Sequence, residues 1–167
     1  FAYTTDDVVR TALDSRSQGQ IINDYNKLYG TDYVDIVDVW AYKDDDFSNR
    51  TTNENITKAY IELTQDNYKS RIDDVLQWYP NCTELYLFED GSVTSLESMY
   101  DTNNMNTARQ IENVHFMDGY FKNLTNFNRT FRHLDYLKRV ENLPNSITSM
   151  SYGFEFAGSK SSEGLTL

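Results

Sequence analysis

The side chains able to carry out acid–base or metal chemistry are few and scattered. The chain has two histidines, His115 and His133, and a single cysteine, Cys82. Neither histidine has a second ligand at metal spacing, and one cysteine excludes an internal disulfide framework or a Cys-based zinc site. No Gly-x-Ser-x-Gly elbow, Gly-x-Gly-x-x-Gly motif or phosphate loop occurs. We therefore expect no catalytic residues, no metal site and no cofactor.

Acidic residues offer the other candidate chemistry. The aspartate run 44–46 could bind calcium through several oxygens, but it lacks the Asp-x-Asp-x-Asp-Gly alternation of a calcium loop. A solvated loop is the favoured interpretation of this run. Asp32, Asp35 and Asp38 lie in a segment that we expect to be buried, so we expect them to need basic partners.

Tyrosine is the most direct indication of a binding function, with 13 residues in the chain. A tyrosine ring supplies a rigid apolar surface and a hydroxyl at little cost in conformational entropy, which suits recognition surfaces. The alternative is that many of these rings belong to the core, as we expect for Tyr100. The predicted binding residues are Tyr86, Tyr120, Tyr136 and Tyr152.

Length and composition exclude several classes of protein. The 167 residues are 39 % hydrophobic and suffice for one domain or two small ones, and the aromatic content of 14 % argues against disorder. A net charge of −11 argues against sequence-independent binding of nucleic acid or anionic lipid. No stretch approaches the roughly 18 apolar residues of a membrane helix. Because the chain opens with Phe1 and shows no signal peptide, we expect a processed or truncated piece.

Hydrophobic periodicity predicts mostly helix before residue 80. Helical spacing of apolar residues predicts one kinked helix or two short ones over 5–29, further helical spacing over 56–63, and a longer helix over 68–79 that Pro80 ends. Segment 33–42 is rich in β-branched and aromatic residues and is predicted to form a mostly buried strand. Segment 83–88 is predicted to form a short strand. We interpret residues 1–79 as a mostly helical capping region.

The second half of the chain contains an internal repeat. Segments 93–100, 124–131 and 147–154 each read apolar, Thr, Asn or Ser, apolar, three variable residues, aromatic. The offsets are 31 and 23 residues, and the second falls in the range of leucine-rich repeats. We expect each unit to lay a short strand beside the previous one, because a single repeat cannot bury its own apolar face.

These residues resemble the BspA-like leucine-rich repeats of surface proteins. The closest stretch is 143–154, which reads Leu-Pro-Asn-Ser followed by Ile-Thr-Ser-Met, three residues and Phe154. The resemblance covers residues 80–167, with an overlong first unit and a last unit that lacks its apolar return. It implies binding to a cell surface, a host protein or a glycan, and it extends to phage structural proteins.

The expected fold class is α+β, with an N-terminal helical cap and a strand followed by a short leucine-rich repeat solenoid. Its units start near Val93, Leu124 and Ile147, and we expect the last unit to be degenerate or only partly formed, as in an array truncated at its C-terminal end. The expected function is non-catalytic recognition or adhesion, with a cell-surface protein or glycan as partner, an extracellular location, no nucleic acid and no membrane insertion. The alternative is a structural subunit of a phage virion, in its tail, fibre or capsid, that docks to other virion proteins.

Overall fold

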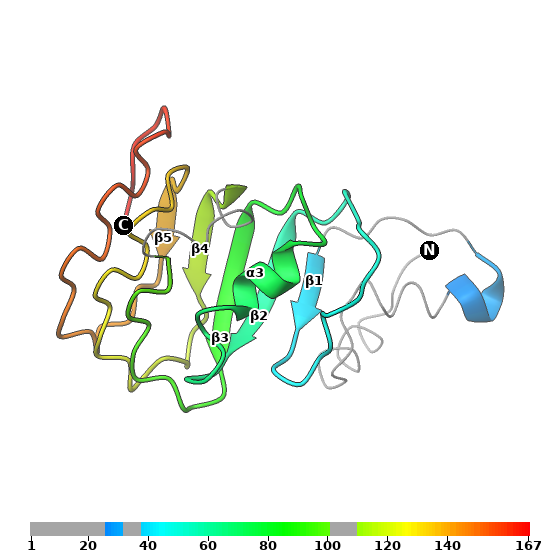
Figure 1. Cartoon of the computed structure of the whole chain (residues 1–167), viewed down its shortest axis with the longest axis horizontal. Helices are drawn as coiled ribbons and strands as arrows, with labels where there is room; N and C mark the ends of the chain where they lie inside the picture. The colour runs from blue at the N-terminus through cyan, green and yellow to red at the C-terminus, as the bar shows by residue number, and fades with distance from the viewer. Residues whose placement is uncertain (1–25, 32–37, 101–109) are drawn as a thin grey trace.

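The protein is built on one parallel β-sheet whose strands follow one another in chain order (Figure 1). The structure is a computed structural model, and it describes residues 26–31, 38–100 and 110–167. Besides the strands, the described residues contain a helical turn at 26–29 and helix α3 at Arg71–Leu76, and α3 packs against β2. The five strands are β1 Asp38–Ala41, β2 Lys58–Leu63, β3 Glu84–Glu89, β4 Asn113–Phe116 and β5 Arg139–Glu141.

Neighbouring strands pair in register, so that equivalent residues lie side by side across the sheet. Val39 pairs with Ala59, which pairs with Leu85, and the row continues through Val114 to Val140. These residues are buried, whereas the residues on either side of each are partly or fully exposed in β1, β2 and β5. Since side chains alternate between the two faces of a strand, one face of the sheet points into the core and the other points outward.

The core lies between the inner face of the sheet and the segments that return the chain from one strand to the next. Its largest side chains are phenylalanines in edge-to-face or tilted contacts. Phe116 lies 5.2 Å from Phe121, Phe127 lies 5.2 Å from Phe131, and Phe127 lies 5.3 Å from Phe154, measured between ring centroids. Such aromatic pairs add to the stabilisation that burial provides.

The three copies of the sequence repeat lie beside one another in the return segments. Ser95 forms a parallel bridge with Asn126, and Asn126 forms one with Ser149, so the third residue of each copy meets the third residue of the next. Backbone bonds at the fourth residue repeat this register: Leu96 N donates to Asn126 O at 3.0 Å, and Phe127 N donates to Ser149 O at 2.8 Å. The register therefore satisfies backbone groups of all three copies together.

The predicted α+β fold, with an N-terminal helical cap followed by a short leucine-rich repeat solenoid, is wrong. The described residues form a single five-stranded parallel sheet, their regular secondary structure is mostly β, and they include only two short helices. The main reason lies in 56–63, where helical spacing was expected and β2 is found. Ala59, Ile61 and Leu63 are buried at every second position, which is the period of a strand.

The other expected elements have mixed outcomes. The strand expected at 83–88 is confirmed as β3, and the helix expected over 68–79 is shorter, because α3 spans only Arg71–Leu76. Of the strand expected at 33–42, residues 38–41 form β1, which is buried on one face and not on both. The helix expected over 5–29 lies outside the described residues except for its end at 26–29.

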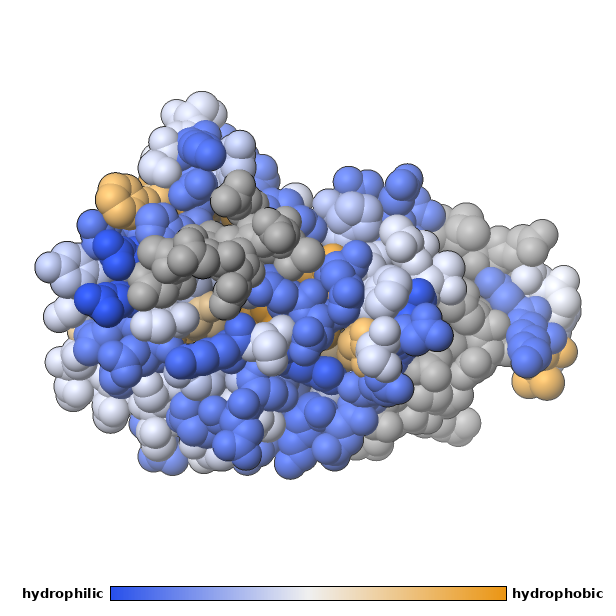
Figure 2. Space-filling view, in the orientation of Figure 1, coloured by the Kyte–Doolittle hydropathy of each residue, from blue (hydrophilic) through white to orange (hydrophobic). Residues whose placement is uncertain are grey.

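The molecular surface agrees with the acidic, polar composition. In the view of Figure 2 hydrophilic side chains cover most of the described surface, and hydrophobic areas are small and separated. Within the described ranges, no helix combines the length and apolar character needed to cross a bilayer.

The aromatic core predicts a large effect of truncating one ring. Phe127 is fully buried and contacts Phe116, Phe131 and Phe154. We expect Phe127→Ala to lower the free energy of unfolding by about 3–5 kcal/mol, measured by urea denaturation. Tyr152→Ala removes an exposed ring and serves as the control, with an expected loss of about 1 kcal/mol or less. Equal losses in the two variants would contradict this description of the core.

Candidate binding face

A row of stacked rings crosses the outer face of the sheet. Trp40 of β1 stacks on Tyr60 of β2 at 4.1 Å between ring centroids, Tyr60 stacks on Tyr86 of β3 at 4.5 Å, and Tyr86 stacks on His115 of β4 at 4.3 Å. The interplanar angles are 7°, 14° and 4°. The strands impose this order, because these residues are register partners and strands pair about 4.8 Å apart. We call these four side chains the ring row.

The ring row ends in a hydrogen-bonded network around His115. The imidazole lies between two carboxylates, with Nε2 at 3.1 Å from Glu84 Oε1 and Nδ1 at 2.8 Å from Glu141 Oε2. The Tyr86 hydroxyl donates to the same Glu84 oxygen at 2.9 Å. Arg139 lies 3.5 Å from the second oxygen of Glu141. The network therefore joins β3, β4 and β5 on the outer face and fixes the rings of Tyr86 and His115.

Charged side chains form a second row beside the rings. Asp38, Lys58 and Glu84 are register partners on β1, β2 and β3. Burial raises the pKa of Asp38, although the neighbouring Lys58 acts in the opposite direction. Lys58 is therefore a basic neighbour of Asp38 on the adjacent strand, and its charge does not offset the effect of burial. Asp32 and Asp35 lie outside the described residues.

The phenols of the ring row lie in an environment that disfavours their ionisation. Burial, followed by the charges of Asp38 and Glu84, raises the pKa of Tyr60. Burial and the hydrogen bond to Glu84 raise the pKa of Tyr86 to about 12. Both phenols therefore keep their protons to a higher pH than an ordinary tyrosine does.

Aromatic contacts continue from the ring row toward the carboxyl ends of the strands through Phe88, which is buried. Phe88 lies on the same face of β3 as Tyr86. Its ring centroid is 6.0 Å from the ring centroid of Trp40 and 5.8 Å from that of Tyr42. Tyr120, in the loop after β4, meets Phe88 edge to face at 5.6 Å. Among the described rings of this face Tyr120 is the most exposed, at 40 %.

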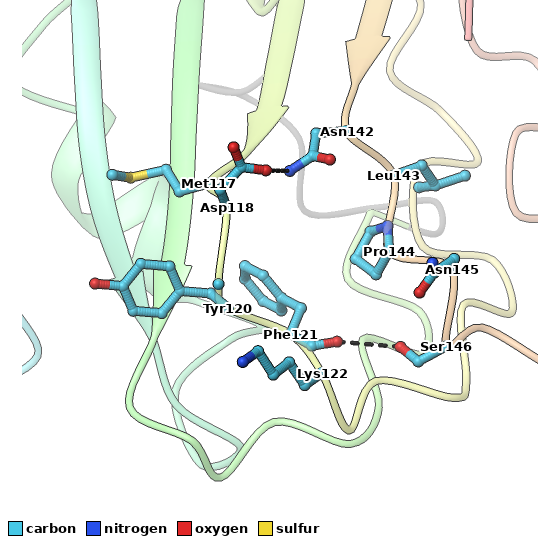
Figure 3. A pocket seen from close by; sticks show the side chains of 11 residues that line it. Met117, Asp118, Tyr120, Phe121, Lys122, Asn142, Leu143, Pro144, Asn145 and Ser146 are labelled. Atoms are coloured by element: carbon cyan, nitrogen blue, oxygen red, sulfur yellow. Dashed lines mark hydrogen bonds between the residues drawn. The ribbon is translucent and has the colours of Figure 1, made fainter.

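A pocket of about 230 Å³ lies beside Tyr120, between the loops that follow β4 and β5 (Figure 3). Asn142 closes one side, because its Nδ2 donates to Phe116 O at 2.7 Å and to Asp118 Oδ1 at 2.8 Å. The Ser146 hydroxyl ties the two loops together at the other side, at 2.6 Å from Leu124 O.

The four predicted tyrosines separate into two groups. Tyr86 lies in the ring row, and Tyr120 joins it through Phe88 and also lines the pocket. Tyr136 and Tyr152 are exposed in return segments, where Lys160 lies near the Tyr136 ring and Arg129 and Arg132 lie near the Tyr152 ring. Tyr152 occupies the sixth place of its repeat copy, a left-handed position with φ 56°.

The sequence analysis missed Trp40, Tyr60 and His115 as members of a shared surface. The sequence pattern that marks this surface is an aromatic or imidazole side chain, which faces outward, between two apolar residues that face inward. The pattern occurs once in each of four strands. Its four instances are Val39-Trp40-Ala41, Ala59-Tyr60-Ile61, Leu85-Tyr86-Leu87 and Val114-His115-Phe116.

The aspartate run 44–46 folds as a turn that uses its own oxygens. Asp45 Oδ2 accepts a bond from Tyr42 N at 2.9 Å, and Asp46 Oδ1 accepts bonds from the backbone and hydroxyl of Ser48. The hydrogen bonds from Ser48 lower the pKa of Asp46. In the part of the chain that the structure describes, no three His, Cys, Asp or Glu side chains gather as metal ligands would.

Comparison with known proteins gives no relative from which a role could be transferred. No protein-family model, curated protein or solved structure matches the chain. The surface described above is therefore the basis for a functional assignment.

The raised pKa of Tyr86 predicts that the folded protein loses stability at alkaline pH through the ionisation of this residue. Between the ordinary phenol pKa of 10 and the value of about 12 in the folded chain, the folded state keeps a proton that the unfolded state releases. The folded state then binds more protons, so stability falls as pH rises through this window. We expect Tyr86→Phe to lose less free energy of unfolding between pH 10 and 12 than the native chain, measured by urea denaturation at each pH.

Glu84→Gln provides the second arm of this experiment. It removes the charge that disfavours the tyrosinate while keeping an oxygen that can accept the phenol hydrogen bond. The variant is expected to show a shallower alkaline loss than the native chain. If all three proteins lose stability with the same slope, the described environment of Tyr86 is wrong.

Proposed function

We propose that the protein is a non-catalytic recognition module that binds a partner on a cell surface with the outer face of its sheet. The observation that supports this most strongly is the ring row, four rings from four strands stacked on a partly exposed face. Trp and Tyr are the residue types that most often dominate binding energy at interfaces. The face thus concentrates suitable side chains on a rigid support.

Stacking gives the ring row an advantage that separate surface tyrosines lack. Each inner ring is held between two neighbours, and the Tyr86 hydroxyl is bound to Glu84. Rings already fixed in the free protein lose little conformational freedom when a partner binds. The alternation of Asp38, Lys58 and Glu84 beside the rings would orient a partner of complementary charge.

The proposal is tested by retention of the fluorescently labelled chain on intact cells. We expect saturable retention, and Tyr60→Ala is expected to weaken it by about tenfold or more, because a central ring of a binding surface is removed. Tyr152→Ala is the matched control, since it removes an exposed ring outside the row, and it is expected to retain native binding. Both variants are first shown by urea denaturation to be folded under the conditions of the binding assay.

Pretreatment of the cells identifies the chemistry of the receptor. Loss of retention after protease assigns a protein receptor, and loss after periodate assigns a glycan. Absence of saturable retention on every cell type, or equal effects of Tyr60→Ala and Tyr152→Ala, would reject recognition through this face.

A further inference from the structure

The three repeat copies are joined by a regular ladder of backbone hydrogen bonds in the return segments. The N–H groups at the fourth, sixth and eighth places of one copy donate to the carbonyls at the third, fifth and seventh places of the next. Copy 93–100 donates to copy 124–131 at 2.9–3.0 Å, and copy 124–131 donates to copy 147–154 at 2.8–2.9 Å. In Figure 1 the copies follow one another from green through yellow to orange. All bonds of this ladder are therefore donated in one direction along the array.

The last copy repeats this donor pattern on the side that faces away from the second copy. We call this side of 147–154 the terminal edge. The Thr148 carbonyl there accepts no bond from a described residue, whereas the equivalent carbonyls of Thr94 and Thr125 each accept two bonds from the next copy. Among the described residues, no group accepts a bond from the donors of this edge, which are the N–H groups of Met150, Tyr152 and Phe154.

The terminal edge also leaves core positions of the last copy uncovered. At the fourth place, Leu96 and Phe127 are fully buried, whereas Met150 is 39 % exposed. At the first and eighth places the residues of the first two copies are buried, but Ile147 and Phe154 are only partly buried. These side chains are apolar like their buried equivalents, so the difference comes from their position at the end of the described array. A segment placed over the terminal edge would bury them.

The opposite end of the array is closed by side chains that imitate a preceding copy. Gln65 Oε1 accepts bonds from the N–H groups of Thr94 and Ser95 at 2.8 and 3.0 Å, and Gln65 Nε2 donates to Ser95 O at 3.0 Å. The Tyr68 hydroxyl donates to Glu97 O at 2.8 Å. Between two copies, backbone groups at the second, fourth and sixth places make the equivalent bonds. The first copy is therefore capped by Gln65 and Tyr68.

The hydrogen-bonding pattern of the terminal edge determines what can cover it. Donors on alternate residues need carbonyls at the same spacing, which an added polypeptide segment provides. A second copy of this chain does not match, because its own terminal edge presents donors. The third-place and fifth-place carbonyls of its first copy are already bonded to Gln65 and Tyr68. A segment with free carbonyls must therefore come from a different protein.

The backbone of the copies adds a further requirement for such a segment. The sixth place is left-handed in all three copies, with φ values of 55–56° at Ser98, Arg129 and Tyr152. A segment that pairs along the whole edge must adopt the same turn, so its sixth residue has to tolerate a positive φ, as Asn and Gly do.

We propose that the terminal edge binds a repeat-like polypeptide segment of another protein, which adds to the array as a fourth copy. Carbonyls of its third, fifth and seventh residues accept the bonds of Met150, Tyr152 and Phe154, and its apolar fourth residue packs against the Met150 side chain. This surface goes beyond the proposed function, because its partner is not the cell-surface partner and the ring row takes no part. Stacking of one unit on the next is how repeat arrays bury their apolar surface.

The test is amide hydrogen exchange of the isotope-labelled full chain, measured by NMR with and without a synthetic peptide of residues 122–133. This sequence accepts the bonds of the first copy in the native array, so it contains the required carbonyls. In the free chain we expect slow exchange at the amides of the second copy, and fast exchange at those of Met150, Tyr152 and Phe154.

Added peptide is expected to shift these three amide signals saturably, with a dissociation constant on the order of 1 mM or below. At about ten times that concentration, exchange at the three amides is expected to slow about tenfold. A peptide of the same composition in scrambled order is expected not to bind. Unchanged exchange at the three amides in the presence of the 122–133 peptide overturns the proposal.

Two matched variants separate docking on this edge from a general effect of added charge. Met150→Asp places a carboxylate where the peptide would pack and is expected to weaken peptide binding about tenfold or more. Leu28→Asp makes the same kind of change at an exposed leucine of the helical turn at 26–29, far from the copies in Figure 1, and is expected to bind like the native chain. Urea denaturation first shows that both variants are folded. Equal peptide binding by the two variants would reject the terminal edge as the site.

The same measurement identifies a second copy as the occupant if the proposal is wrong on that point. Exchange at Met150, Tyr152 and Phe154 that slows as the concentration of the free chain rises would assign the edge to self-association and reject a different protein. Peptide binding does not depend on cells, so its failure leaves the cell-retention test of the outer face untouched. Failure of cell retention likewise leaves peptide binding at the terminal edge untouched.

Discussion

In-register parallel pairing of the strands is the constraint on which the rest of the structure depends. It places Val39, Ala59, Leu85, Val114 and Val140 in one row on the inner face, where they form part of a continuous core. The same pairing makes partners of the residues one position further along, which face outward. Strand spacing is close to the stacking distance of aromatic rings, so rings at equivalent outward positions stack without further adjustment. Core and binding face are therefore two results of one register.

The pocket follows from the same constraint. All strands run in one direction, so the loops after β4 and β5 leave the sheet at the same edge and lie side by side. Asn142 and Ser146 join these loops by hydrogen bonds to Phe116 and Leu124. Tyr120 lies where the loop edge meets the outer face, and through Phe88 it links the pocket to the ring row.

Sequence patterns predicted the local features and missed those that depend on pairing between distant segments. The spacing of Leu85 and Leu87 predicted β3, and the three repeat copies lie beside one another in the structure. Segment 56–63 was misread as helical, because its apolar residues fit both periods over so short a length, and burial between β1 and β3 decides for a strand. The rings of Trp40, Tyr60, Tyr86 and His115 are 20, 26 and 29 residues apart. Their proximity therefore requires the register, which composition and local spacing do not contain.

The central claim is that the outer face, and not the exposed return segments, makes contact with the partner. Its most direct test is covalent labelling of tyrosines in the free chain and in the chain bound to intact cells, followed by mass spectrometry. The account predicts that binding protects Tyr60, Tyr86 and Tyr120 from labelling, while Tyr136 and Tyr152 react equally in both states. Protection of Tyr136 and Tyr152 with unchanged labelling of the other three would contradict it and assign recognition to the opposite side of the molecule.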